Sequence, residues 1–377
     1  MQDNKNYCPD LFTGLFLRKE DENTTRIGHC CVSLESAPTT VVSMNHPDLQ
    51  QARQYFLETG ELPVKQCQHC IKAEETGSPS HRKARWSSLK EFPIEVKLKK
   101  LDYNCDNVCN LKCIMCGGQY SSAWLEDEVK LGIRENVNIK KTKHNKTFEQ
   151  VDIQYLEKVY FNGGEPLMSR DHIRVLTRII NNHPDASKVR VLYSINGTFE
   201  FTEEMLIIWK NFYEVSFSIS IDAIGECFEY TRYGAKWAGV EQTLLRYQRS
   251  GLPNVKLRIG ASVGTHNILY FGDLIKWSMD NNYDLTMQQN VSGELTTLNF
   301  PKHCVNQLAD YVHSIPDCDA KLALLNLIQA VPNFPENSRQ WVRKLNKLDA
   351  IRGNSWKKSL SRLYNLDPEY FEEFNIV

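Results

Sequence analysis

The chain has 377 residues, of which 41% are hydrophobic and 24% are charged, as in an ordinary folded globular protein. Its 45 basic and 46 acidic side chains nearly cancel, which gives no reason to expect a nucleic-acid or membrane partner. No apolar run reaches the roughly 18 residues of a membrane span, and the polar start at Met1 to Asp10 lacks the apolar centre of a targeting signal. We therefore expect a cytoplasmic protein, whose thiols stay reduced.

Cysteine is concentrated in two parts of the chain, and in a reducing compartment such groups indicate metal binding before disulfides. The first group lies in the first 70 residues and comprises Cys8, Cys30, Cys31, Cys67 and Cys70. The second lies within twelve positions and comprises Cys105, Cys109, Cys113 and Cys116. The remaining cysteines, Cys227, Cys304 and Cys318, are isolated and are interpreted as packing residues.

Strand and helix patterns alternate through the middle of the chain. Residues 1–93 have few strand signals, and one helix is expected there, around Leu49–Leu57. The first predicted strand, Ile94–Tyr103, runs into the second cysteine group. Further strands are predicted at Lys158–Asn162, Val189–Ile195, Val215–Ile221, Val255–Val263 and Asp284–Gln289. Helical spacing of apolar residues begins at Ile173, at Met205 with Thr202 as its N-cap, at Val240 and at Phe271, and another helix is expected near Ala320–Ala330.

Six strands that alternate with helices predict parallel pairing through right-handed crossovers. We therefore predict an α/β fold, a partial (β/α)6 TIM-like barrel over residues 94–290. A cysteine-rich module (residues 1–93) precedes the barrel, and a short C-terminal extension (residues 291–377) follows it. Chemistry in such barrels lies at the C-terminal ends of the strands. Polar segments follow four predicted strands in succession, at Cys109–Cys116, Gly163–Pro166, Asn196 and Asp222.

The segment Cys109-Asn-Leu-Lys-Cys113-Ile-Met-Cys116 has the spacing C-x3-C-x2-C. Three thiolates on one tight loop can hold three irons of a [4Fe–4S] cube and leave the fourth iron open. An open iron can chelate the amino and carboxylate groups of S-adenosylmethionine (SAM). The alternative is a zinc site, which takes four ligands and would use Cys105 as the fourth. Because a fourth thiolate on the cube would block SAM, we interpret Cys105 as a packed strand-end residue.

A second motif, Gly163-Gly164-Glu165-Pro166, follows the predicted strand Lys158–Asn162. The two glycines let the backbone come close to a ligand, and the glutamate can accept hydrogen bonds from an ammonium group. A turn of this kind is a weak signal alone. Its place one β/α unit after the cysteine loop makes the combination specific.

With these two motifs, residues 94–290 resemble the radical SAM superfamily. The resemblance implies that Cys109, Cys113 and Cys116 bind a [4Fe–4S] cluster, and that Gly163, Gly164, Glu165 and Pro166 hold the amino group of SAM. Such a cluster cleaves SAM reductively to a 5′-deoxyadenosyl radical, which abstracts hydrogen from a substrate. An electron donor such as flavodoxin or ferredoxin is then an expected partner. The resemblance also assigns residues around SAM: Ser218, Ser220 and Asp222 near the ribose, Asn196 at a strand end, and Arg258 at the carboxylate.

The N-terminal cysteines resemble the auxiliary-cluster module called twitch, a shortened relative of the SPASM domain. This resemblance implies that an auxiliary Fe–S cluster is bound by Cys8, Cys30, Cys67 and Cys70, with Cys31 as an alternative to Cys30. Twitch modules usually follow the barrel, whereas this one precedes it. The alternative is a zinc site that only staples the N-terminus, for which His29 and His69 are further candidate ligands. The segments Gln119–Trp124 and Tyr230–Trp237 share the resemblance.

The substrate is the least specified part of the function. Relatives with such modules modify ribosomal peptides, protein side chains or small metabolites, so a peptide or a small molecule is expected here. Residues 1–93 leave little room for a leader-binding domain, and a peptide would be recognised by a separate partner or by residues 291–377. The second functional class is a metal-stapled binding or regulatory protein that keeps the barrel without turnover. Cleavage of SAM separates the two classes.

Overall fold

One sheet of eight strands organises the chain. The computed structural model describes residues 6–21, 23–33, 35–75, 80–83, 92, 94–137, 146–249, 251–289, 293–331 and 337–375. The strands are β1 (Gly14–Lys19), β2 (Thr25–Gly28), β3 (Lys100–Asn104), β4 (Lys158–Asn162), β5 (Arg190–Ile195), β6 (Glu214–Ser220), β7 (Val255–Val263) and β8 (Asp284–Gln289). Their order in the sheet is β2-β1-β3-β4-β5-β6-β7-β8. Every pair is parallel except β1 with β2.

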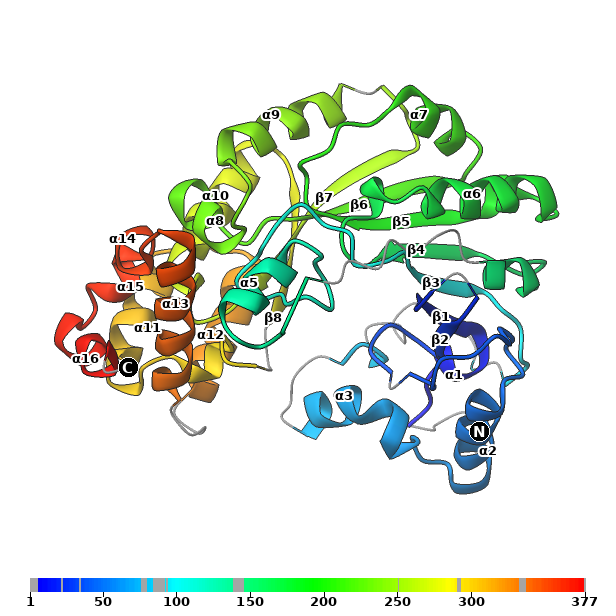
Figure 1. Ribbon diagram of the computed structural model, residues 1–377, viewed down its shortest axis with the longest axis horizontal. Coiled ribbons are helices and arrows are strands. Elements are labelled where there is room, and N and C mark those ends of the chain that lie inside the picture. Colours follow the sequence, from blue (N-terminus) through cyan, green and yellow to red (C-terminus); the bar gives the residue numbers. More distant parts are fainter. Residues whose placement is uncertain are drawn as a thin grey trace.

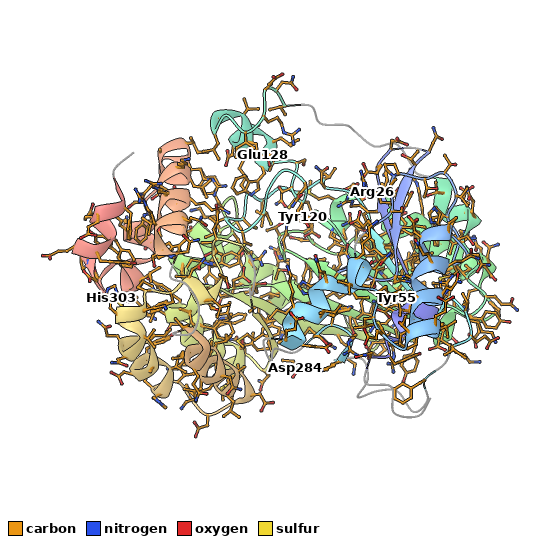
Figure 2. The ribbon with its side chains drawn as sticks, turned by 90° about the horizontal axis from the view of Figure 1, so that it is seen from below. Arg26, Tyr55, Tyr120, Glu128, Asp284 and His303 are labelled. Atoms are coloured by element: carbon orange, nitrogen blue, oxygen red, sulfur yellow. The ribbon has the colours of Figure 1, made fainter. Side chains whose placement is uncertain are left out.

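Helices cover the convex side of this arched sheet (Figure 1). They include α6 (Asp171–Asn182), α7 (Glu203–Trp209), α9 (Trp237–Gln248) and α10 (Phe271–Asp280). The N-terminal helices α1 (Asp10–Thr13), α2 (Pro47–Thr59) and α3 (Val64–Glu75) lie at one edge of the arch. The C-terminal helices lie at the other edge: α11 (Val305–His313), α12 (Asp319–Ala330), α13 (Ser338–Arg352), α14 (Trp356–Ser359), α15 (Ser361–Tyr364) and α16 (Pro368–Glu372). Figure 2 shows the same division from below, with His303 on one side and Arg26 and Tyr55 on the other.

The two faces of the sheet differ in polarity because successive strand residues point to opposite sides. The outer residues of β4, β5 and β6 are apolar and fully buried, and Phe161, Tyr193 and Phe217 stack across these three neighbouring strands. The residues between them on the inner face, such as Tyr160 and Ser194, are only partly buried. The concave inner face of the sheet, called the inner wall below, is therefore hydrophilic. The hydrophobic core lies between the outer face and the helices.

The predicted partial barrel is confirmed, and β4 to β8 lie within one residue of the predicted bounds. The first strand begins only at Lys100, because the residues before it bond elsewhere: Lys97 and Lys99 donate their N–H groups to Phe12 and Thr13. The side chain of Thr202 accepts a hydrogen bond from Met205 N at 3.3 Å, which confirms this N-cap. No helix among the described residues is long and apolar enough to cross a membrane.

Residues 1–93 contribute two short strands that the sequence did not indicate. Strand β1 pairs in parallel with β3, with Phe16 opposite Asp102, and β2 extends the sheet beyond it. The apolar run around β1 showed no clear alternation, because most of its side chains are buried on both faces. The N-terminal region is thus joined to the barrel by a continuous ladder of hydrogen bonds.

Candidate functional site

Four strand ends bring the predicted residues together at the C-terminal edge of the sheet. The cysteine loop follows β3, the glycine turn follows β4, and Asn196 and Asp222 follow β5 and β6. Asn196 links the third end to the loop, since its Nδ2 lies 4.0 Å from the Cys109 sulfur and donates to Asn110 Oδ1 at 2.8 Å. The loop and the end of β5 are therefore in direct contact.

The glycine turn packs backbone against backbone on the cysteine loop. Gly164 N donates to Asp106 O at 2.7 Å, and Glu165 N donates to Val108 O at 2.8 Å. A Cβ on Gly164 would lie 2.7 Å from the carbonyl carbon of Asn107 and closer still to the Val108 oxygen. Gly163 has φ of +122°, which favours glycine. The glycines thus allow close approach to the loop itself, and their contact with a ligand stays a prediction.

The buried side chain of Glu165 stabilises the glycine turn through hydrogen bonds. The side chain is 1% exposed, and its two oxygens accept hydrogen bonds from Leu167 N at 3.1 Å and Asn196 N at 2.7 Å. Burial raises the pKa of Glu165 to about 7, although these two N–H donors act to lower it. Each carboxylate oxygen has a second lone pair. Glu165 can therefore still accept the predicted hydrogen bond from an ammonium group.

The cysteine loop is held in an electropositive setting by a residue that sequence reasoning did not single out. Arg232, just after α8 (Gly225–Thr231), has Nη1 at 3.8 Å from the Cys113 sulfur. Its Nη2 pairs with Asp222 Oδ2 at 2.8 Å. Asp222 is fully buried, and its other oxygen accepts from Ser262 N at 2.8 Å. Asp222 is thus placed to orient Arg232, and its predicted contact with the ribose stays a prediction.

The three thiols differ in their surroundings. The hydrogen bond between Cys113 and Cys116 raises the pKa of Cys113 and lowers that of Cys116, and the guanidinium of Arg232 acts to lower both. Burial raises the pKa of Cys109. Cys105 is fully buried and its N–H donates to Asn162 O at 3.0 Å, as expected for a packed residue at the strand end.

Three predicted SAM residues lie on the inner wall of the sheet. Ser218 and Ser220 are partly buried on β6, and Ser218 is opposite Arg258 of β7 in the strand register. Arg258 stands five residues before the end of β7, which corresponds to about 17 Å along the strand. The structure therefore places Arg258 beside Ser218 and deeper in the barrel than the cysteine loop, and its contact with the SAM carboxylate stays a prediction.

The N-terminal cysteines surround a small enclosed cavity. Cys8 precedes α1, Cys30 follows β2, and Cys67 and Cys70 lie one turn apart on α3. All four line the cavity, together with His29, His81 and Arg82. Burial raises the pKa of all four thiols, and that of Cys67 reaches about 12. Metal binding there must therefore displace protons.

The two alternatives for the second ligand are separated by the fold. Cys30 lines the cavity, whereas Cys31 does not, and the Cys31 backbone N–H donates to Asp102 Oδ2 on β3 at 3.1 Å. His29 is 3% exposed and lines the cavity, and both of its ring nitrogens lack hydrogen-bond partners among the described residues. His69 is exposed on α3 and does not line it.

The spacing of the sulfur atoms bears on the choice between zinc and a larger cluster. A tetrahedral zinc site with Zn–S bonds of about 2.3 Å needs sulfur atoms about 3.8 Å apart. Among the described residues, one group has its ligand atoms all within 4.8 Å, and it consists of Asp10, Cys30 and His81. Neither the loop cysteines nor the N-terminal set closes to that size. Cys30 therefore lies close enough to Asp10 and His81 to share one metal ion with them.

The chain is similar to known proteins over part of its length. The model of the radical SAM superfamily matches residues 103–268. No curated protein matches the chain. A similar solved structure is "anSMEcpe with bound AdoMet", at 17% identity and a TM-score of 0.41, covering 57% of this chain and 58% of that one. Another is Streptococcus suis SuiB bound to S-adenosylmethionine, at 13% identity and a TM-score of 0.39, covering 89% and 76%.

Proposed function

We propose that the chain is a radical SAM enzyme, from the premise that residues 103–268 match the model of the radical SAM superfamily. Proteins of this family use a [4Fe–4S] cluster and SAM. Cys109, Cys113 and Cys116 would hold the [4Fe–4S] cluster, which would supply the electron for reductive cleavage of SAM to a 5′-deoxyadenosyl radical able to take a hydrogen atom from the substrate. A small electron-transfer protein such as flavodoxin or ferredoxin would supply the electron.

The observation that carries the proposal is the cysteine loop itself. Its three thiols follow the C-x3-C-x2-C spacing on one loop, and Arg232 supplies a largely buried positive charge 3.8 Å from Cys113. A cation next to thiols favours the thiolate form that binds metal. The glycine turn and Asn196 bond directly to the same loop. Four strand ends therefore share one site.

The surrounding residues divide into ligand-facing and supporting groups in this proposal. Gly163, Gly164, Glu165 and Pro166 would hold the amino group of SAM, and Asn196, Ser218 and Ser220 would face its other polar groups. Asp222 acts through Arg232, because its own surface is fully covered. Arg258, opposite Ser218 on the inner face of the sheet, would face the carboxylate of SAM.

The N-terminal cavity is proposed to hold an auxiliary Fe–S cluster, bound by Cys8, Cys30, Cys67 and Cys70. It lies beside the other end of β3 from the cysteine loop. Asp10 Oδ2, which belongs with Cys30 and His81 in one compact group, is 3.5 Å from Nζ of Lys100, the first residue of β3. The substrate would then bind along the hydrophilic inner wall between the two sites.

The proposed organisation keeps three parts: residues 1–93 with the auxiliary cluster, the barrel over residues 94–290, and the extension over residues 291–377. The proposed substrate is a peptide or protein side chain or a small polar metabolite, because the wall offers hydroxyl and phenol groups such as Tyr160 and Ser194, joined at 2.7 Å. A catalytically silent, metal-stapled protein is the second candidate, favoured only by the compact Asp10–Cys30–His81 group.

The test is reductive cleavage of SAM by anaerobically purified protein, measured as 5′-deoxyadenosine. Cys113→Ala removes one of three cluster ligands and should abolish cleavage. Cys105→Ala is the matched control, since it removes a thiol four positions from Cys109 that only packs, and it should retain most of the activity. Equal loss in both variants would show that the ligands are misassigned. Absence of cleavage in the unaltered protein would favour the silent alternative.

A further inference from the structure

The C-terminal extension reaches the catalytic loop through one buried residue. Arg352 is the last residue of α13, and its side chain is 2% exposed. Its guanidinium lies between two aromatic rings, 4.7 Å from the centroid of Trp124 and 4.7 Å from that of Tyr233. Its Nε donates to Asp127 Oδ2 at 2.8 Å. Arg352 thus touches α5 (Trp124–Lys130) and the segment after α8 at once.

Each of these partners is itself bonded to the cysteine loop. Trp124 Nε1 donates to Cys113 O at 2.8 Å, and Lys112 N donates to Tyr233 O at 2.8 Å. Asp127 accepts from Lys112 Nζ at 2.9 Å with its second oxygen. The loop residues in these contacts, Lys112 and Cys113, are the centre of the C-x3-C-x2-C segment.

The charges form a buried chain from the loop to the extension. Asp127 has a side chain 1% exposed, and it bridges Lys112 on one side and Arg352 on the other. Within the described residues, the two terminal nitrogens of Arg352 have no hydrogen-bond partner. The positive charge of Arg352 is therefore balanced by Asp127 and by the faces of the two rings. Removing it would leave Asp127 with Lys112 alone.

A second contact beside the first fixes the position of α13. Asp349, one turn before Arg352, accepts from Tyr230 OH at 2.9 Å and from Trp356 N at 2.7 Å. Tyr230 lies two residues before Arg232, whose guanidinium faces the Cys113 sulfur. Tyr233 OH also donates to Arg352 O at 3.3 Å. The end of α13 is therefore bound by Tyr230 and Tyr233, which flank Arg232, the residue that faces the thiols.

We infer that Arg352 is a positioning residue for the catalytic cysteine loop, and that the C-terminal extension completes the cluster site from outside the radical SAM domain. The guanidinium sets the spacing of Trp124, Asp127 and Tyr233, and these three set the backbone of Lys112 and Cys113. Lysine in its place would keep the charge, but it would lose the flat face that contacts both rings. The role therefore depends on the shape of arginine as well as on its charge.

The extension offers a matched control in Arg362. This residue also docks the extension on the barrel: it pairs with Asp273 at 2.8 Å and lies 5.0 Å from the centroid of Tyr270. None of these contacts reaches the cysteine loop. Arg362→Lys should weaken docking at the surface while leaving Lys112 and Cys113 in place. Arg352→Lys and Arg362→Lys can therefore be compared in the full-length chain.

The first measurement is amide hydrogen exchange of the full-length chain, read at Lys112 and Ile114, whose N–H groups donate to Tyr233 and Thr231. We expect exchange at these amides to be about tenfold faster in Arg352→Lys and unchanged in Arg362→Lys. Asp127→Asn provides a second variant, with the same expected direction at Lys112. Unchanged exchange in Arg352→Lys and Asp127→Asn, or equal acceleration in Arg362→Lys, would overturn the inference.

The second measurement is the electron paramagnetic resonance spectrum of the reduced cluster, which a change in packing far from the loop would not alter. We expect Arg352→Lys to broaden or shift this spectrum and Arg362→Lys to leave it unchanged. A spectrum unaltered in both variants would contradict a positioning role. This arm rests on the proposed function, whereas hydrogen exchange does not require a cluster. Failure of the proposed cluster therefore leaves the exchange result to decide the inference.

Discussion

Among single residues, Arg232 connects the predicted SAM residues to the thiols. Its guanidinium joins Asp222, at the end of β6, to Cys113 in the loop after β3. Removing one member of a buried ion pair leaves an uncompensated charge and typically costs about 3–5 kcal/mol. Asp222 and Arg232 are therefore expected to tolerate no change in charge, although neither need touch SAM.

Gly164 offers a direct test of how the glycine turn supports the loop. In Gly164→Ala the new Cβ would meet backbone atoms of Asn107 and Val108, which cannot move aside as a side-chain tip can. We expect a destabilisation of about 1–3 kcal/mol, as in other overpacked sites, and reduced incorporation of iron into the loop. Denaturant unfolding and iron analysis of the purified protein measure the two effects.

The matched control is Gly239→Ala. Gly239 lies in α9, where a Cβ would meet no atom within 4 Å. Alanine there should stabilise the helix by about 0.5–1 kcal/mol and leave the iron content unchanged. If Gly164→Ala behaved like this control, the glycine turn would not be what holds the loop.

Among the elements, α3 is the one that we expect to depend most on the proposed N-terminal metal site. Only Cys70 and Ala73 of its side chains are buried, so little apolar surface holds it in place. Its described ionic anchor is Glu74, which pairs with Arg82. A helix of this kind gains much of its stability from metal binding.

Replacing Cys67 and Cys70 together by alanine should therefore loosen α3 and remove the auxiliary cluster. The barrel's own site uses neither residue, so we expect iron and sulfide to fall by the equivalent of one cluster, while cleavage of SAM continues. Cys31→Ala is the control, because Cys31 adjoins Cys30 but does not line the cavity. It should keep both clusters. Complete loss of SAM cleavage in the double variant would mean that the two regions fold as one unit through the β1–β3 pairing.

On the scale of the whole molecule, local sequence patterns predicted the barrel far better than the regions before and after it, residues 1–93 and 291–377. Strands β4 and β6 alternate between a buried apolar outer face and a polar inner face, and that alternation is visible in the sequence. Strand β1 is buried on both faces, so its sequence does not alternate between apolar and polar residues. The short helices after α12 have few apolar positions each, and their packing comes from contacts distant in sequence.

The candidate site shows the same limit. The thiols and the glycine turn were found because their spacing is local. Arg352 and Asp127 are separated by 225 positions, and no local motif indicates that they meet. Arg232 lies within Tyr230–Trp237, a segment that the family resemblance had marked, but its pairing with Asp222 depends on how α8 returns to the sheet. Contacts made by tertiary packing are thus the part that a single sequence does not reveal.

The most direct test of the central claim is electron paramagnetic resonance of the reduced, anaerobic protein with and without SAM. An open iron on the loop cluster should bind SAM and change the spectrum. The account predicts this change in the unaltered protein and in the Cys67→Ala/Cys70→Ala variant, and its absence in Cys113→Ala. A spectrum that does not respond to SAM, or stoichiometric zinc with no iron signal, would contradict it.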